Sequence, residues 1–292
     1  MISLDKLSSS QIGIVPLNWK YNSARMGEYL DGIAAYGFKG IQLSMDQGNS
    51  PDFVQAMEDH SLKFAEIYVA VHMTTEGIEA ISETETAETI ALAARVGVEM
   101  VVFAVDGTTE RDLCATRAAT GPQLTDLAYS QLADHINRFA KIAQEHGMQS
   151  SFHPHAATFI ETFAETEKLM NLLDPELVGV CLDVGHWIVG GGDPIEAIQH
   201  FGERITHVHI KDVSGEVLTK LASGEIASME DSVMKDKLFV PAGTGVLDLH
   251  GVLGALASQN FTGWLMSEQD SAWEPSEAAS GISYANIIAA LK

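Results

Sequence analysis

Cysteine is scarce in this sequence. Only two of its 292 residues are cysteines, Cys114 and Cys181, and neither belongs to a CxxC or similar ligand spacing. A disulfide framework and a cysteine-based structural zinc site are therefore not indicated, and both residues are expected to pack in the core.

Basic residues are also few. Seventeen Lys and Arg stand against forty Asp and Glu, which gives a formal net charge of −23. A surface of this sign repels nucleic-acid phosphates and anionic membranes, so neither is an expected partner. We interpret the acidic excess as a solvated surface. The sequence leaves the oligomeric state open, and a homo-oligomer is one of the options.

Long apolar runs and nucleotide-binding motifs are missing as well. No stretch approaches the roughly 18 consecutive apolar residues of a membrane span, and the start MISLDKLSSSQIG lacks the basic-then-apolar layout of a signal peptide. We therefore expect a cytoplasmic protein. The segment IGIVPLNW carries no GxGxxG, which disfavours a dinucleotide-binding fold.

The sequence does contain a regular alternation of short apolar β-rich runs with longer segments of helical periodicity. Strands are expected at 11–15, 39–44, 63–70, 98–104, 148–153, 177–182, 204–210 and 262–268. Helices are expected near 23–36, 51–60, 76–96, 124–146, 160–173, 193–201, 248–257 and 276–291. Eight such units favour a single (β/α)₈ TIM barrel over 1–292, of the α/β class. The segment 211–241 lacks clear periodicity, and we expect it to be a loop that covers the site.

Residues of metal-binding type end four consecutive late strands, where a barrel of this kind carries its catalytic groups. They are His153 and His155 after the fifth strand, Asp183 and His186 after the sixth, His209, Lys211 and Asp212 at the seventh, and Glu268 at the eighth. His207 and His209 share one face of their strand, and His209 is favoured because it lies nearer the C-terminal end. Imidazole and carboxylate donors without thiolates suit one divalent ion, with Mn²⁺ and Co²⁺ favoured and Mg²⁺ and Zn²⁺ possible.

Three further positions have two interpretations each. Trp19 could stack on the apolar face of a sugar or pack in the core. Asn18 could bind a substrate hydroxyl or cap its loop. Glu66 lies inside the third strand and faces either the barrel interior or the helices. Asn18 and Trp19, together with Asp212, are the candidate substrate-binding residues.

The late motifs LDVGHW, HVHIKDV, FVPAGTGVLDL and GWLMSEQD resemble those of the xylose-isomerase-like barrel superfamily of sugar isomerases, epimerases and lyases. IGIVPLNW and HPHAATFIET are similar to motifs of the inosose dehydratases within it. The resemblance implies metal ligands at His153, Asp183, His209 and Glu268. It also implies that His155, His186 and Lys211 lie near the substrate, and that Glu268 takes part in catalysis.

The same resemblance implies a metal-dependent dehydratase that acts on inosose or a related keto-polyol. Most isomerases and epimerases of the superfamily have Glu where this chain has His153. Two carboxylates serve proton exchange on both faces of an enediolate, so the change favours elimination. A ketose isomerase or 3-epimerase is the first alternative, and a non-catalytic sugar-binding barrel is the second. An abasic-site endonuclease would need a basic groove, which the charge of −23 disfavours.

Overall fold

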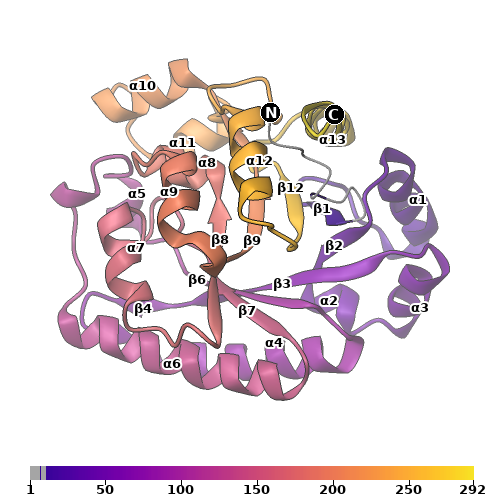
Figure 1. Ribbon diagram of the computed structural model, residues 1–292, viewed down its shortest axis with the longest axis horizontal. Helices are drawn as coiled ribbons and strands as arrows, with labels where there is room; N and C mark the ends of the chain where they lie inside the picture. Colours follow the sequence, from indigo (N-terminus) through magenta and orange to yellow (C-terminus); the bar gives the residue numbers. More distant parts are fainter. Residues whose placement is uncertain (1–6, 8–10) are drawn as a thin grey trace.

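Eight parallel strands close into a barrel in the computed structural model, which describes residue 7 and residues 11–292 (Figure 1). The strands are β1 (Ile12–Val15), β2 (Gly40–Leu43), β3 (Lys63–Val71), β6 (Met100–Val105), β7 (Gln149–Phe152), β8 (Val178–Asp183), β9 (Ile205–Ile210) and β12 (Leu265–Glu268). Their order around the barrel is β1-β12-β9-β8-β7-β6-β3-β2, and β1 pairs with both β12 and β2. The predicted (β/α)₈ barrel is thereby confirmed.

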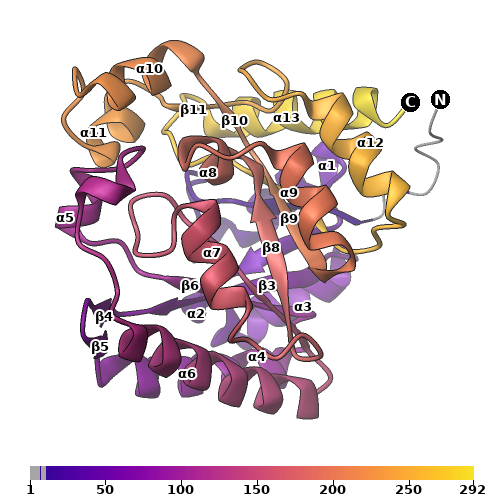
Figure 2. The same cartoon turned by 60° about the vertical axis from the view of Figure 1, so that its left-hand side comes forward.

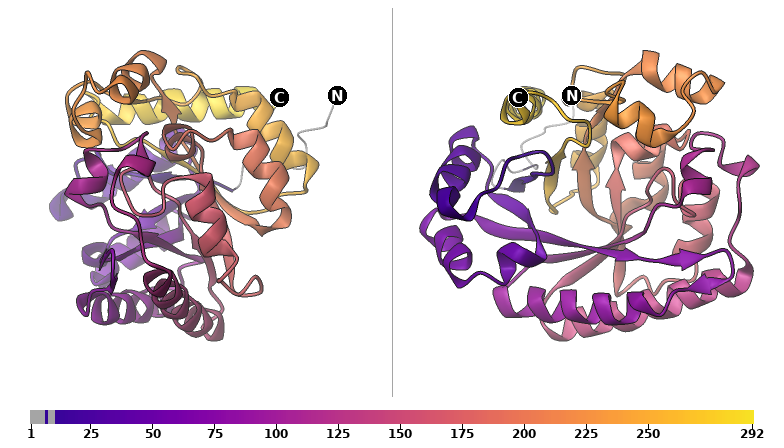
Figure 3. Two further views of the ribbon diagram at one scale, coloured as in Figure 1. Left: turned by 90° about the vertical axis from the view of Figure 1, so that its left-hand side faces the viewer. Right: turned by 180° about the vertical axis from the view of Figure 1, so that it is seen from behind.

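Helices surround the barrel and follow the strands in the predicted order (Figure 3). They are α1 (Met26–Tyr36), α3 (Pro51–Asp59), α4 (Ile81–Val96), α6 (Asp126–Glu145), α7 (Phe163–Met170), α9 (Pro194–Phe201), α12 (Leu249–Ser258) and α13 (Ser276–Ala290). Helix α4 begins later than predicted because β4 (Met73–Thr74) and β5 (Gly77–Ile78) form a small antiparallel ribbon before it. None of the helices in the described part of the chain is long and apolar enough to cross a membrane.

Additional short elements follow the C-terminal ends of the strands. They are α2 (Met45–Gly48), α5 (Thr109–Asp112), α8 (Val184–Val189), α10 (Gly215–Ser223), α11 (Met229–Met234) and the strands β10 (Asp212–Val213) and β11 (Phe239–Val240). The last four make up most of the segment 211–241, so this segment consists of helices and a two-stranded ribbon where an irregular loop was expected.

The segment 211–241 packs on the barrel through its own apolar cluster, which includes Val217, Leu221 and Phe239. Figure 2 shows α10 and α11 as an outer layer beside α5. The backbone N–H of Glu230 donates to Asp112 at 2.8 Å, which ties α11 to α5. Movement of this segment as a lid remains a prediction.

Two register shifts interrupt the barrel. Between β2 and β3, Ile41 pairs with Phe64 and Gln42 with Glu66, so Ala65 is an extra residue on β3. Between β8 and β9, Val180 pairs with Ile205 and Cys181 with His207, which leaves Thr206 as an extra residue on β9. A bulge of this kind redirects the side chains that follow it. Both bulges therefore help to turn polar groups toward the barrel interior.

Candidate metal centre and active site

The four predicted metal ligands lie together at the C-terminal end of the barrel. They come from four neighbouring strands, because His153 follows β7, Asp183 ends β8, His209 lies in β9 and Glu268 ends β12. One donor atom from each lies within 4.8 Å of the other three. His153 Nε2 is 3.4 Å from Asp183 Oδ2, and His209 Nδ1 is 2.7 Å from Glu268 Oε2.

The donor atoms of this cluster have the character of ligands. Asp183 Oδ2, His209 Nδ1 and Glu268 Oε2 are buried and accept or donate no hydrogen bond. Asp183 uses its other oxygen, Oδ1, to accept from the backbone N–H of His186 at 2.8 Å, which caps α8. Asp183 Oδ2 and Glu268 Oε2 have only ion pairs with the Lys211 ammonium, and a divalent cation would bind all three atoms at once. The residues present therefore fit a divalent ion.

Glu66 holds His209 from the opposite side of the barrel. Its strand β3 lies across from β9, and its fully buried Oε2 accepts from His209 Nε2 at 2.8 Å and also from His207. With Nε2 directed at Glu66, His209 Nδ1 faces Asp183 and Glu268. A carboxylate behind a metal-binding histidine fixes both its tautomer and its orientation. His207 lies deeper and contacts Glu66, so the choice of His209 as the ligand candidate agrees with its position.

Lys211 places an ammonium group among the carboxylates of the site. Its Nζ lies 2.6 Å from Asp270 Oδ2, and 3.1 Å from both Asp183 Oδ2 and Glu268 Oε2. Burial disfavours the charge, yet Asp183, Asp270 and Glu268 outweigh it and raise the pKa of Lys211 above its ordinary value. Lys211 is therefore a charged donor at neutral pH. Asp270, which sequence reasoning did not single out, is the partner that holds it most closely.

His155 and His186 stack beside the cluster with ring centroids 3.6 Å apart. His155 Nδ1 lies 2.7 Å from the carbonyl oxygen of Ala156, so Nδ1–H donates there and Nε2 keeps its lone pair. Burial, together with His186, His153 and Lys211, holds the pKa of His155 well below its usual range. Burial and Lys211 also lower the pKa of His186. Both rings are therefore neutral, and either can accept a proton.

Phe239 of β11 covers this part of the site. Its ring centroid lies 5.0 Å from that of His186 and 4.9 Å from Lys211 Nζ. The segment 211–241 thus reaches the site through an aromatic side chain. Sequence reasoning missed Phe239, although it lies in the FVPAGTGVLDL motif.

The three predicted substrate-binding residues take structural positions. The Trp19 ring packs in the core against Tyr29 and Tyr36 and donates to Ser280 at 3.0 Å, so of its two interpretations the structure agrees with packing. The Asn18 amide donates to the carbonyl oxygens of residues 269 and 270 at 2.8 and 3.1 Å, and so anchors the loop that carries Asp270.

Asp212 is the third of these residues and is fully buried. Its carboxylate accepts from the backbone N–H groups of Val213, Gly243, Gly245 and Leu247 at 2.8 to 3.0 Å. All of its acceptor capacity is used to hold the loop after β11. A substrate-binding role for Asp212 therefore does not agree with the structure.

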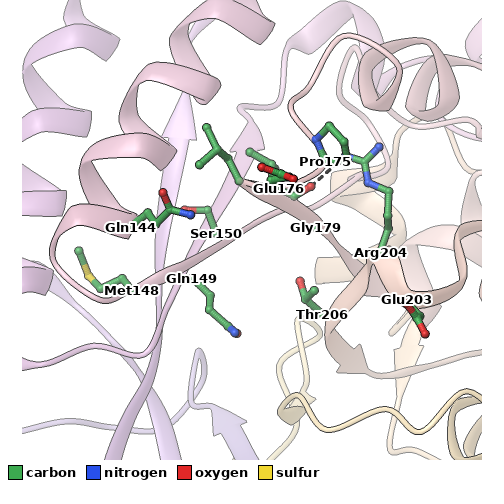
Figure 4. Close-up of a pocket in the computed structure, with 12 residues that line it drawn as sticks. Gln144, Met148, Gln149, Ser150, Pro175, Glu176, Gly179, Glu203, Arg204 and Thr206 are labelled. Carbon is green, nitrogen blue, oxygen red and sulfur yellow. Dashed lines mark hydrogen bonds between the residues drawn. The ribbon is translucent and has the colours of Figure 1, made fainter.

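A separate hollow of about 480 Å³ lies at the opposite, N-terminal end of the strands (Figure 4). Ser150, Gly179 and Thr206, near the beginnings of β7, β8 and β9, line it together with Arg204. The Arg204 guanidinium already donates to the carbonyl oxygens of Met170 and Val178, at 2.9 Å each. Polar groups at this end of a TIM barrel serve stability, so we assign the hollow no catalytic role.

A family comparison agrees with this architecture. The sequence profile described as "Xylose isomerase-like TIM barrel" matches residues 30–286. The chain belongs to the xylose isomerase-like TIM barrel family. Among individual relatives, an inosose dehydratase of Bacillus cereus (strain AH820) is 28% identical over 278 residues, which cover 91% of this chain and 92% of the relative.

Solved structures share the fold at lower identity. The 3-keto-D-glucoside 4-epimerase YcjR from E. coli superposes with a TM-score of 0.72 at 17% identity, over 96% of this chain and 99% of that one. The probable 3-DHS dehydratase AsbF from Bacillus anthracis gives 0.70 at 14% identity, over 95% and 98%. The IOLI protein, solved with a bound zinc atom, gives 0.68 at 17% identity, over 98% and 96%. Solved proteins with this barrel fold therefore include an epimerase and a probable dehydratase.

Proposed function

We propose that the chain is a metal-dependent carbon–oxygen lyase that removes water from inosose (2-keto-myo-inositol) or a related keto-polyol. The relative named inosose dehydratase supports the substrate class. The observation that carries the proposal is the donor cluster of His153, Asp183, His209 and Glu268 beside the two neutral histidines and the charged Lys211. A lyase of this type needs an ion, a base and an acid, and this arrangement supplies a place for each.

His153, Asp183, His209 and Glu268 would hold the ion. A divalent ion there supplies Lewis-acid polarisation of the substrate carbonyl, which eases loss of a proton from the adjacent carbon. His155 is the candidate base, because its Nε2 carries the lone pair and the ring is neutral. It takes the proton from the carbon beside the carbonyl.

Lys211 is the candidate acid. Its ammonium donates a proton to the leaving hydroxyl group, so that water departs as the carbon–carbon double bond forms. Asp270 contacts both the Lys211 ammonium and His186. Its Oδ2 lies 2.6 Å from Lys211 Nζ and 3.5 Å from His186 Nε2. After water has left, the proton that His155 took from carbon restores the Lys211 ammonium, and both groups return to their starting state. Phe239 and the segment 211–241 limit access of bulk water to these groups.

Epimerisation uses the same ion and the same first proton transfer, but it needs a second carboxylate on the other face of the substrate. His153 occupies the position where most epimerases of the superfamily have Glu, which weighs toward elimination. A non-catalytic sugar-binding barrel would have no use for the buried ammonium and the neutral histidine pair.

The test is incubation of the metal-loaded protein with a panel of keto-inositols and ketoses in D₂O, followed by NMR and ultraviolet absorbance. We expect loss of water, seen as a new enone or diketone absorbance, with keto-inositols. His155→Gln should abolish it while the protein still binds the ion, and chelated wild type is the second control. Deuterium exchange without loss of water would instead indicate an epimerase or isomerase. No reaction with any compound, with the ion demonstrably bound, would contradict an enzymatic role toward these substrates.

A further inference from the structure

Cys181 lies directly below the metal cluster. It precedes Asp183 by two residues on β8, so both side chains point to the same face of the strand, which is the barrel interior. The residue is fully buried and packs with Met100 and Val102. Its thiol also interacts with the imidazole of His209.

The thiol belongs to a second donor group that shares two residues with the first. His153, Cys181 and His209 each offer one ligand atom, and these atoms lie within 4.8 Å of one another. In a tetrahedral zinc site, nitrogen and sulfur ligands lie about 3.3–3.6 Å apart, so small side-chain adjustments would close the group around an ion. The two imidazoles thus have carboxylates above them and a thiol below them.

Both histidines of this group are buried, and one nitrogen of each makes no hydrogen bond. His153 and His209 are 2% and 1% exposed, and the Nδ1 atom of each is buried without a hydrogen bond. A buried thiol beside one satisfied imidazole would be ordinary core packing. A buried thiol beside two imidazoles, each with a nitrogen that makes no hydrogen bond, has the composition of a zinc site.

We infer that Cys181 is a further ligand of the site and that, with His153 and His209, it takes a thiophilic divalent ion such as Zn²⁺, Co²⁺ or Cd²⁺. Binding breaks the S–H bond, forms a sulfur–metal bond and releases the proton to the buffer. The inference rests on the metal site of the proposed function but on no step of the reaction. It gives the centre a preference for soft and borderline ions over Mg²⁺ and Mn²⁺, which the carboxylates alone would not supply.

Cys114 provides a matched control within the same chain. It is also buried and free, but its Sγ lies 3.5 Å from the carbonyl oxygen of Arg111. Within residues 11–292, the groups of residues that could hold an ion do not include it. Substituting serine for either cysteine makes the same chemical change, so a difference in metal binding between the two variants reports the position of the cysteine.

The experiment is titration of the metal-free wild type, Cys181→Ser and Cys114→Ser with Co²⁺, followed by absorption spectroscopy. The visible ligand-field bands of Co²⁺ report binding itself, and a thiolate-to-cobalt charge-transfer band in the near ultraviolet reports sulfur coordination. We expect both signals in wild type and Cys114→Ser. In Cys181→Ser we expect the ligand-field bands with loss of the charge-transfer band, and a lower affinity for Zn²⁺ with little change for Mn²⁺.

The wild type alone can overturn the inference, so a variant that fails to fold does not weaken the test. Ligand-field bands without the charge-transfer band in wild type would exclude a thiolate ligand while leaving the proposed function intact. A charge-transfer band that persists in Cys181→Ser would exclude this cysteine. Failure of all three proteins to bind Co²⁺ or Zn²⁺ would overturn the inference together with the metal part of the proposed function. Turnover of keto-inositols is measured separately and bears only on the reaction.

Discussion

Glu66 gives the sharpest prediction for the metal centre. Substitution of Glu66 by Gln keeps the size of the side chain but removes the negative charge that accepts from both His207 and His209. The amide oxygen can take the place of Oε2, but a neutral acceptor holds the His209 Nε2–H less strongly than a carboxylate does, so His209 Nδ1 is less firmly fixed toward Asp183 and Glu268. We therefore expect weaker binding of a divalent ion without loss of the fold.

The magnitude follows from the role of such a carboxylate. Loss of a group that orients a metal-binding histidine weakens metal affinity about 10–100-fold, which corresponds to about 1.4–2.7 kcal/mol. Glu66 is fully buried, so water cannot take its place, and we expect the upper part of this range. Glu66→Asp keeps the charge but shortens the reach, and should lose a similar amount if orientation dominates.

Isothermal titration calorimetry with Mn²⁺, Co²⁺ and Zn²⁺ measures the effect. The matched control is Glu99→Gln, which removes one negative charge at the other end of the barrel, where Glu99 contacts Lys63 and Trp264. Wild-type affinity in Glu66→Gln, or an equal loss in Glu99→Gln, would refute the reasoning. An intact far-ultraviolet circular dichroism spectrum is required of every variant.

Three more predictions concern stability. Lys211→Met leaves three carboxylates, two of them buried, without their cation. The free energy of unfolding of the metal-free variant should therefore fall by about 3–5 kcal/mol. Calorimetry should show that an added divalent ion restores much of this loss, and no restoration would contradict the site. Asp212→Ala should lower the free energy of unfolding in urea by about 2–3 kcal/mol, because its backbone partners lose a charged acceptor. Metal affinity should not change, and a lower affinity would indicate that Asp212 contributes to the metal site. Burial lowers the pKa of His135 from 6.5 to about 4. Between these pH values the unfolded chain takes up a proton at His135 and the folded chain does not, so up to about 3 kcal/mol of stability present above pH 6.5 is lost as the pH falls toward 4. His135→Asn should remove this part of the dependence of unfolding free energy on pH. An unchanged pH dependence would show that other groups cause it.

The barrel, and the rim on which the polar strand ends gather, could be predicted because both depend on local patterns; the choice of four ligands among those strand-end residues came from the family resemblance. Alternating strands and helices fix parallel pairing, and parallel pairing brings the C-terminal ends of the strands to one rim. His153, Asp183, His209 and Glu268 stand at such ends, so their proximity in the structure follows from the chain order alone.

The groups that support these ligands depend on distant contacts and escaped prediction. Glu66 was left between two orientations, because the extra residue Ala65 shifts the alternation of β3 in a way that sequence parity does not reveal. Asp270 lies beyond the end of β12, where its direction is set by Asn18 from the other end of the chain. The sequence alone leaves Trp19 between substrate contact and core packing, because its burial depends on α1 and α13 packing around it.

The short β10–β11 ribbon has a consequence for how this enzyme could change over evolution or in the laboratory. Asp212 pairs with Val240 and Val213 with Phe239, so the β10–β11 ribbon holds together the two ends of the excursion, the segment that contains α10 and α11. Insertions or deletions within the excursion would leave the neighbouring Lys211 and Phe239 where they are. The same barrel could therefore acquire new substrate selectivity by exchange of this segment, while Lys211, the histidine pair and the candidate ion-binding residues stay in place.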